Sequence, residues 1–328
     1  MNTSLSLVIP AFNEGRRLAD GLERLMGSIS PDDTEIIVVD DGSADDTADV
    51  ARRQLKEWAR SCVVSLPHNR GKGAAVKAGV IRARGGVIAF IDADMASDPA
   101  DLNYLLAAVE RSHVAVGSRA HEASLVSSRG THGIRRELMN RVFGTFVASM
   151  TRLPYMDTQC GFKAFRGPVA KLLVHGAQVD RFAFDVELLD LAARLGLRIE
   201  EVPVRWTDIA GSHVRPMHDG LQMLGDIIRM RLVRRRPPPV QGVMVPEIPI
   251  EDAGELIQPL IRKVDLMIQW GGGTAVFFPC LPPTESLRVL NRLSSHLESG
   301  NPQLMSVEFG TLFAPILATG IFSGNFSM

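Results

Sequence analysis

Apolar runs alternate with segments of helical periodicity along the first 232 residues. The runs typical of strands are Leu5–Ile9, Glu35–Val39, Val63–Leu66, Val87–Ile91 and Val114–Gly117. Helical periodicity begins at Glu14, at Asp46, after Gly73 and after Pro99. Strands that alternate with helices predict β-α-β units, and therefore an α/β fold with a mostly parallel sheet flanked by helices.

The pattern becomes less regular after residue 118. Residues 120–133 are polar and rich in Ser, Gly and His, which predicts a mobile loop beside the active site. Beyond it, the sequence predicts helices at Ile134–Met150 and Asp185–Leu195, a strand at Leu197–Trp206 and a basic amphipathic helix at Met217–Arg236. Pro237–Pro239 end this last helix, because proline cannot continue it.

A domain boundary is expected at this proline run. It separates a domain of residues 1–236 from a C-terminal tail of residues 237–328. The tail contains Gly271–Gly273, scattered prolines and no clean periodicity. The sequence therefore predicts neither a defined structure nor a function for the tail.

Composition excludes several broad classes of protein. The chain has 328 residues and is 45% hydrophobic, which suffices for a sizeable core. Its 36 basic and 37 acidic residues argue against nucleic acid as a partner. The three cysteines lack metal-ligand spacing and give no disulfide framework. We therefore expect the protein to be located in a reducing cytosol. Neither a signal peptide nor a membrane-spanning run is expected.

Two carboxylates follow the strand predicted at Val87–Ile91. Asp92 and Asp94 would lie at its carboxyl end, where open α/β sheets hold ligands. Carboxylate oxygens there suit Mg²⁺ or Mn²⁺ carrying a diphosphate. The alternative is structural, with Asp94 or Asp98 capping the helix that begins near Pro99.

Polar residues also follow the first two predicted strands. Pro10–Glu14 and Asp40–Thr47 supply an aromatic ring that could stack on a base and carboxylates that could accept from a base or ribose. Turn and helix-cap chemistry at Asp45 or Asp46 is the alternative. His68–Ala75 places glycines and cations at a helix N-terminus, a plausible anion cradle. Its glycine spacing fits neither a Walker loop nor a dinucleotide fingerprint, which disfavours a kinase or dehydrogenase.

The order of these motifs, with others further along the chain, resembles family 2 inverting glycosyltransferases of the GT-A fold. The motifs are Val8–Glu14, Val38–Ser43, Asn69–Gly73, Asp92–Asp94, Gly117–Arg119, Asp157–Lys163, Phe184–Leu189 and Val204–Trp206 with Gly211–Ser212. Together they are similar to the dolichyl- or polyprenyl-phosphate β-glucosyltransferase branch over about residues 4–232.

The resemblance implies a role for each matching position. Residues implied to bind the nucleotide sugar are Pro10, Phe12, Asn13, Glu14, Asp41, Lys72 and Asp92, with His213 and Arg215 further along. Asp92 and Asp94 are implied to bind the metal, Mg²⁺ or Mn²⁺. Asp157 and Gln159 are implied to face the sugar and acceptor, and Glu187 and Arg119 to line the same catalytic pocket.

The implied reaction transfers glucose from UDP-glucose to a polyprenyl monophosphate, with inversion. A phosphate monoester has a second pKa of about 6, so the attacking group is already largely anionic at neutral pH. Asp157 would then orient the acceptor or the sugar and need not be a strong base. The basic helix would bring the enzyme to the cytoplasmic face of a membrane, unless it only packs on the sheet with its basic end in solvent.

Two departures from the family pattern leave alternatives open. His213 stands where many relatives have Lys, so contact with the diphosphate would shift to Arg215 or depend on pH through His213. Ala96 and Ser97 stand where mannose-using relatives often have Gln, which modestly favours glucose. GDP-mannose as donor, a soluble acceptor, or a non-catalytic nucleotide-sugar-binding protein remain the alternatives.

Overall fold

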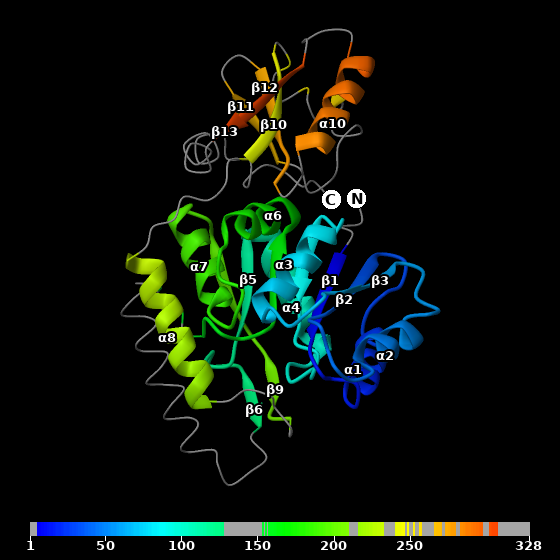
Figure 1. Cartoon of the computed structure of the whole chain (residues 1–328). Coiled ribbons are helices and arrows are strands. Elements are labelled where there is room, and N and C mark those ends of the chain that lie inside the picture. Colours follow the sequence, from blue (N-terminus) through cyan, green and yellow to red (C-terminus); the bar gives the residue numbers. More distant parts are fainter. Residues whose placement is uncertain are drawn as a thin grey trace. The chain divides into compact units, whose positions relative to one another are not determined.

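The computed structural model describes residues 5–127, 153, 155, 157–209, 216–232, 240–246, 248, 252, 256–257, 266–270, 273–279, 283–297 and 302–307. Contacts divide the chain into two compact units (Figure 1). The N-terminal unit comprises Asn2–Arg166 and Ala177–Arg234, and the C-terminal unit comprises Arg235–Met328 together with Gly167–Gly176.

A seven-stranded sheet forms the centre of the N-terminal unit. Its strands are β1 (Leu5–Ala11), β2 (Thr34–Asp40), β3 (Ser61–Ser65), β4 (Val87–Phe90), β5 (Val114–Ser118), β7 (Lys163–Arg166) and β8 (Ile199–Pro203). Their order is β3-β2-β1-β4-β7-β5-β8, and only β7 runs antiparallel to its neighbours. The predicted α/β fold with a mostly parallel sheet is confirmed.

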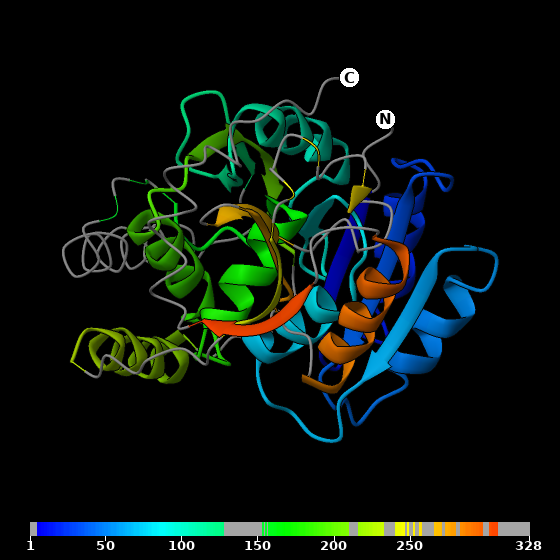
Figure 2. The same ribbon diagram turned by 90° about the horizontal axis from the view of Figure 1, so that it is seen from above.

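Helices cover both faces of this sheet (Figure 2). They are α1 (Leu18–Met26), α2 (Thr47–Gln54), α3 (Lys72–Arg82), α4 (Leu102–Arg111) and α7 (Phe184–Arg194), and α8 (Pro216–Leu232) packs against α7. Leu7 and Ile9 of β1 belong to the same apolar cluster as residues of α1, α2 and α4. On the other face, the ring of Phe90 lies 5.8 Å from that of Phe184 in α7. Burial on both faces explains why these strands appear as continuous apolar runs.

Two elements differ from the predicted pattern. The strand predicted at Leu197–Trp206 is divided into β8 and β9 (Arg205–Thr207), and β9 pairs with β6 (Leu125–Ser127) in a separate sheet. The chain leaves the main sheet at Val204, whose N–H donates to the Oγ of Ser124 at 3.0 Å. In addition, α1 begins four residues later than predicted, because residues 12–17 form turns.

The helix predicted from Met217 is confirmed through Leu232 as α8. Among the described residues, no helix combines the length and the apolar character needed to span a bilayer. The predicted helix Ile134–Met150, together with His213 and Arg215, lies outside the described residues.

A second sheet occupies the C-terminal unit, where the sequence predicted no regular structure. Its elements are β10 (Val240–Val245), β11 (Leu266–Trp270), β12 (Gly273–Phe277), α10 (Pro283–His296) and β13 (Gln303–Val307), with α6 (Gly167–Gly176) grouped in the same unit. The sheet order is β11-β12-β10-β13 and all neighbours are antiparallel. β10 and β11 thus run parallel with β12 between them, as in split β-α-β folds. Ala275, Val276 and Phe277 of β12 are all buried, so this strand shows no alternation of buried and exposed residues.

Candidate active site at the carboxyl end of the sheet

The loops that carry the predicted site residues meet at one edge of the seven-stranded sheet. β1, β2 and β4 are parallel, so the residues that follow them lie at the same edge. β7 runs the opposite way, so the segment before it, residues 157–162, arrives at that edge as well. The antiparallel strand therefore brings Asp157 to the edge that carries Asp92.

Polar groups after β1 and β2 tie two loops to each other. The N–H of Asn13 donates to Ser43 Oγ at 2.9 Å, and Asn13 Oδ1 accepts from the N–H of Ala44 at 2.9 Å. Glu14 accepts from Arg17 Nη2 at 2.7 Å. The side chains of Asn13 and Glu14 thus already hold protein groups, and they shape the surface on which a base and ribose would lie.

Asp41 fixes the start of α3. Its two oxygens accept from the N–H groups of Arg70 at 2.8 Å and Gly71 at 2.7 Å. Burial raises the pKa of this carboxyl, although both hydrogen bonds oppose the change. Gly71 has φ 110°, and a Cβ at this position would lie 2.6 Å from the carbonyl oxygen of Asp180. The backbone from which Lys72 extends is therefore held on two sides.

Lys72 forms an ion pair with Asp92. Its Nζ lies 2.5 Å from Asp92 Oδ1 and 5.8 Å from the centre of the Phe184 ring. Burial would lower the pKa of Lys72, but the charges of Asp92 and then Asp185 raise it above its ordinary value. On the other side of the carboxylate, a Cβ on Gly161 would lie 2.1 Å from Asp92 Oδ2. Asp92 thus lies between Lys72 and Gly161, and a side chain at position 161 would displace its carboxylate.

Asp94 keeps one oxygen available. Its Oδ1 accepts from the N–H of Ala96 at 3.0 Å, whereas its Oδ2 makes no hydrogen bond within the described part of the chain. Burial, followed by the charge of Asp92, raises the pKa of Asp94. The helix cap is Asp98, which accepts from the N–H of Ala100 at 3.0 Å. Of the two acids considered as helix caps, Asp98 therefore has this structural role and Asp94 does not.

The two carboxylates fit a divalent metal that arrives with a diphosphate. The described residues contain no group of three or more acidic, His or Cys side chains arranged to hold a metal ion. Mg²⁺ is commonly bound through one or two carboxylates, with substrate phosphates and water completing its shell. The Lys72 ammonium at Asp92 indicates that this position attracts a cation. Asp92 and Asp94 would hold the metal.

Arg119 and Asp157 form a bidentate ion pair. The guanidinium Nε lies 2.6 Å from Asp157 Oδ2, its Nη2 lies 2.8 Å from Oδ1, and the N–H of Arg119 donates to Oδ2 at 3.0 Å. Burial would raise the pKa of Asp157, but the hydrogen bonds and charge of Arg119 lower it below its ordinary value. Asp157 is therefore ionised near neutral pH and is a weak base. The guanidinium also lies 5.7 Å from the ring of Trp206.

Gln159 and Glu187 have different surroundings. The N–H of Gln159 donates to Asp157 Oδ1 at 3.2 Å, and its Nε2 lies 2.7 Å from Met223 Sδ in α8. Glu187 accepts from the N–H groups of Gln178 at 2.9 Å and Val179 at 2.8 Å. Burial raises the pKa of Glu187 in spite of these bonds. Its carboxylate holds the segment before α7, and no hydrogen bond in the described structure joins it to Arg119 or Asp157.

A buried pair that sequence reasoning did not assign lies beside these groups. Lys163 is fully buried, and its Nζ lies 2.6 Å from both Asp185 Oδ1 and the carbonyl oxygen of Cys160. It thereby joins α7 to the segment that carries Asp157. The signal in the sequence is a lysine within an apolar run, between Phe162 and Phe165, because a buried lysine needs an acidic partner.

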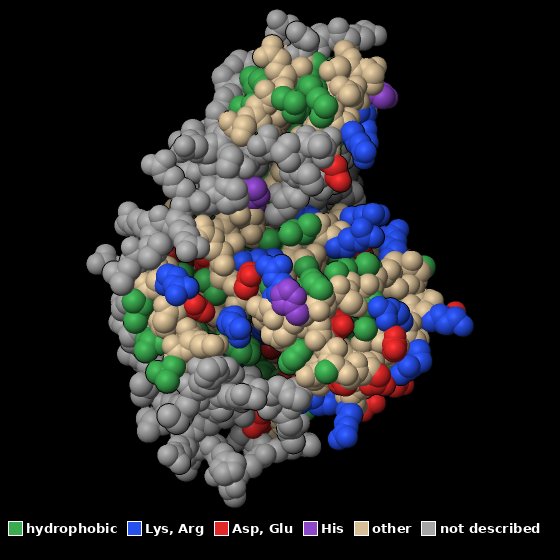
Figure 3. Space-filling view, in the orientation of Figure 1, with side chains coloured by type: hydrophobic (Ala, Val, Ile, Leu, Met, Phe, Trp, Pro, Cys, Tyr) green, Lys and Arg blue, Asp and Glu red, His purple; other side chains and the backbone are tan. Residues whose placement is uncertain are grey.

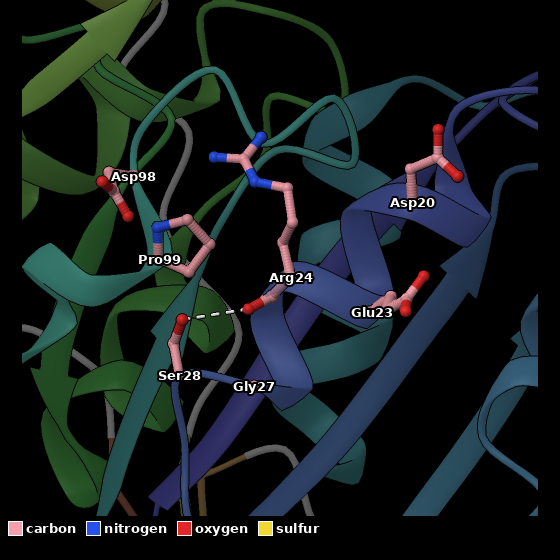
Figure 4. Close-up of a pocket in the computed structure, with 7 residues that line it drawn as sticks. All are labelled: Asp20, Glu23, Arg24, Gly27, Ser28, Asp98 and Pro99. Carbon is pink, nitrogen blue, oxygen red and sulfur yellow. Dashed lines mark hydrogen bonds between the residues drawn. The ribbon is translucent and has the colours of Figure 1, made fainter.

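The described surface also has a hollow of about 520 Å³ next to α1 (Figure 4). Asp20, Glu23 and Arg24 of α1 line it together with Asp98 and Pro99. None of the predicted site residues lines this hollow. The ion pairs at the carboxyl end of the sheet therefore define the candidate site.

Comparison with known proteins identifies the family. The model of glycosyl transferase family 2 matches residues 6–172. A dolichyl-phosphate β-glucosyltransferase from Dictyostelium discoideum is 36% identical over 246 residues, which cover 70% of this chain and 74% of that protein. The human protein of the same name is 36% identical over 245 residues, which cover 70% and 75%. The chain belongs to glycosyltransferase family 2.

Solved structures show the same fold at lower identity. Glucosyl-3-phosphoglycerate synthase from Mycobacterium tuberculosis, crystallised with Mn²⁺ and UDP-glucose, matches with a TM-score of 0.54 and 19% identity. The match covers 87% of this chain and 92% of the synthase. This likeness supports the GT-A fold of the chain.

Proposed function

We propose that this protein transfers glucose from UDP-glucose to a polyprenyl, dolichyl-type monophosphate, with inversion at the anomeric carbon. The observation that carries the proposal is its 36% identity, over about three quarters of their length, to proteins named dolichyl-phosphate β-glucosyltransferase. Residues 1–236 form the catalytic domain in this proposal. Residues 237–328 have no assigned part in the reaction.

The donor lies along the ends of β1, β2 and β4. Pro10, Phe12 and Asp41 border the base and ribose, on a surface that Asn13 and Glu14 shape. Lys72 is directed toward Asp92, so its ammonium is close to where the diphosphate of the donor would lie. A divalent metal held by Asp92 and Asp94, Mg²⁺ or Mn²⁺, would neutralise charge on the leaving nucleoside diphosphate.

The acceptor phosphate approaches the side of Arg119 and Asp157. Two nitrogens of Arg119 face Asp157, whereas its Nη1 makes no hydrogen bond within the described residues, so it has capacity for an anion. An anionic phosphate oxygen needs no base to attack the anomeric carbon, since its second pKa is about 6. Asp157 orients Arg119, and Gln159 is bonded to Asp157 through its backbone. Attack opposite the leaving diphosphate inverts the configuration.

Contact with a membrane surface would bring the enzyme to its lipid acceptor. Apolar side chains are exposed along α8 (Figure 3), where Leu221 is 66% and Ile228 37% exposed, and Arg229 is also exposed. β6 exposes Leu125 and Val126. Apolar and basic side chains on one helix suit an anionic lipid interface. In this proposal the enzyme is peripheral at the cytoplasmic face of a membrane.

Transfer of label to lipid tests the proposed function. The protein is incubated with a polyprenyl phosphate, Mn²⁺ or Mg²⁺, and radiolabelled UDP-glucose or GDP-mannose, and label is counted in the organic phase. Metal-dependent label from UDP-glucose alone is expected, and a parallel Asp94→Asn sample controls for passive extraction. Label from GDP-mannose alone would replace the proposed donor, and label from neither would refute lipid glucosylation.

A further inference from the structure

The contact between Lys72 and Asp92 places a protein cation on a carboxylate assigned to the metal. Nζ of Lys72 lies 2.5 Å from Asp92 Oδ1, and the lysine side chain is 18% exposed. Among described residues this is the ion pair of Lys72, because the nearby Asp185 is already paired with Lys163 at 2.6 Å. The ammonium therefore lies on one of the two oxygens that Asp92 offers to a metal ion.

The backbone below Lys72 cannot move away to release this contact. Asp41 holds the N–H groups of Arg70 and Gly71, and the N–H of Ala74 donates to the carbonyl of Asp180 at 2.9 Å. Only the four-carbon side chain of Lys72 can turn. Rotation of this one side chain would move the ammonium from Asp92 to the diphosphate of a bound nucleotide.

Asp92 lies close to the segment before β7 as well as to the lysine. Its carboxylate lies against Gly161, where an added Cβ would be 2.1 Å from Oδ2 and 2.5 Å from Oδ1. A divalent ion placed on this carboxylate while Lys72 remains would meet a positive charge at close range. The metal and the ammonium therefore exclude each other at Asp92 until an additional anion arrives.

We propose that Lys72 blocks Asp92 against divalent metal in the donor-free enzyme and moves to the diphosphate when the nucleotide binds. Lys72 is then a positioning residue that couples metal binding to nucleotide binding. This inference rests on the proposed function, since it takes Asp92 as a metal ligand. Because coupling between two ligands is reciprocal, each should bind weakly without the other.

Mn²⁺ binding without any sugar transfer tests this inference. Electron paramagnetic resonance counts free Mn²⁺ with wild type and Lys72→Met, each with and without UDP. Methionine keeps an unbranched side chain against Phe184 but carries no charge. We expect Lys72→Met to bind Mn²⁺ without UDP at least about tenfold more tightly than wild type, because the competing cation is absent. The enhancement of Mn²⁺ binding by UDP should become correspondingly smaller.

Lys77→Met is the matched control. Lys77 is on the same helix and its Nζ lies 3.0 Å from Asp180 Oδ1, so this variant removes the same charge from another ion pair. Lys77→Met should bind Mn²⁺ without UDP as weakly as wild type does. Lys72→Arg retains the charge and should likewise bind Mn²⁺ weakly without UDP. Lys72→Gln provides a second neutral variant if Lys72→Met does not fold.

The outcomes separate this inference from the proposed function. One outcome is that UDP increases Mn²⁺ binding by wild type, but the neutral variants of Lys72 bind Mn²⁺ without UDP no more tightly than wild type. The blocking role of Lys72 is then wrong, and the proposed metal site is retained. An equal gain in Lys77→Met would reveal a general charge effect and would also overturn the inference. If UDP brings Mn²⁺ to none of the proteins, the metal-dependent function fails together with the inference.

Discussion

The loops that follow β1 and β2 use their acidic and amide groups differently from the segments that follow β4 and β5. After β2, both oxygens of Asp41 accept from backbone N–H groups of another loop. By contrast, Asp92 after β4 pairs with Lys72, and Arg119 after β5 pairs with Asp157. The Asp41 carboxylate is thus bonded to backbone N–H groups, whereas the Asp92 and Asp157 carboxylates are each bonded to a side-chain cation.

This difference separates rigid groups from exchangeable ones. A backbone N–H group cannot leave a carboxylate without moving the chain, so Asp41 forms a fixed part of the loop after β2. A lysine or arginine side chain can turn to a phosphate or make room for a metal ion. Substitutions in the first region should therefore reduce stability, and substitutions in the second should reduce activity.

The largest expected effect concerns the buried cation pair beside the second region. Lys163→Met leaves Asp185 without its partner in a buried position, which should lower the free energy of unfolding by about 3–5 kcal/mol. The double variant Lys163→Met/Asp185→Leu should recover most of this loss, because it removes both charges. Urea denaturation measures both. A double variant as unstable as the single one would mean that the bond to Cys160 dominates.

Removal of one charge at the end of β4 should impair catalysis and spare stability. Asp94→Asn preserves an acceptor for the N–H of Ala96 but loses the charge that would face the metal, so kcat/KM should fall by about 10²–10³-fold. Steady-state kinetics and thermal unfolding measure the two properties. Asp98→Asn is the control, since Asp98 caps a helical turn and should affect stability alone. Equal kinetic losses in both variants would contradict the distinction.

The opposite behaviour is expected at the end of β2. In Asp41→Asn the side-chain NH₂ group replaces one carboxylate oxygen, so one of the two backbone N–H donors loses its acceptor. The free energy of unfolding should therefore fall by about 1–3 kcal/mol. The KM for UDP-glucose should rise because the start of α3 loosens. Asp49→Asn, which breaks an exposed pair with Arg52, should change stability by less than about 0.5 kcal/mol. An unchanged free energy of unfolding in Asp41→Asn would contradict the idea that this carboxylate stabilises the fold.

The smallest effect is a pH dependence of the Arg119–Asp157 pair. The pKa of Asp157 is lowered in the folded protein, so its stabilising contribution is present above its ordinary value of 3.8 and is lost as pH falls through the folded value. The stability difference between wild type and Asp157→Asn should therefore shrink as the pH is lowered below 3.8. Urea denaturation from about pH 6 to about pH 3 measures it. A constant difference would show that the ion pair does not stabilise the fold.

The sequence predicted the parts of the fold that depend on local pattern. β1 to β5 and the helices between them follow from apolar runs and helical periodicity, because both faces of the sheet are covered. β7 escaped prediction because it has four residues and includes Lys163 and Arg166, which are polar yet buried. In the C-terminal sheet, β12 lacks alternation because Ala275, Val276 and Phe277 are buried in succession.

The sequence named candidate site residues but did not predict the contacts between them. The motifs placed Asp92, Lys72, Asp157 and Arg119 in the site, but their pairing depends on segments far apart in the chain. Glu187 illustrates the limit, because its carboxylate is bonded to the N–H groups of Gln178 and Val179. Sequence spacing does not reveal which acid meets a cation and which meets the backbone.

The position of β7 has a consequence for how the chain acquires its activity during synthesis. β4 and β5 leave the ribosome before residues 163–166, yet β7 lies between them in the sheet. Both strands therefore present an unpaired edge until β7 inserts, which is a period of exposure to aggregation. Insertion of β7 also brings Gly161 against Asp92. Insertion of β7 thus covers the facing edges of β4 and β5 and brings the segment that carries Asp157 to the edge that carries Asp92.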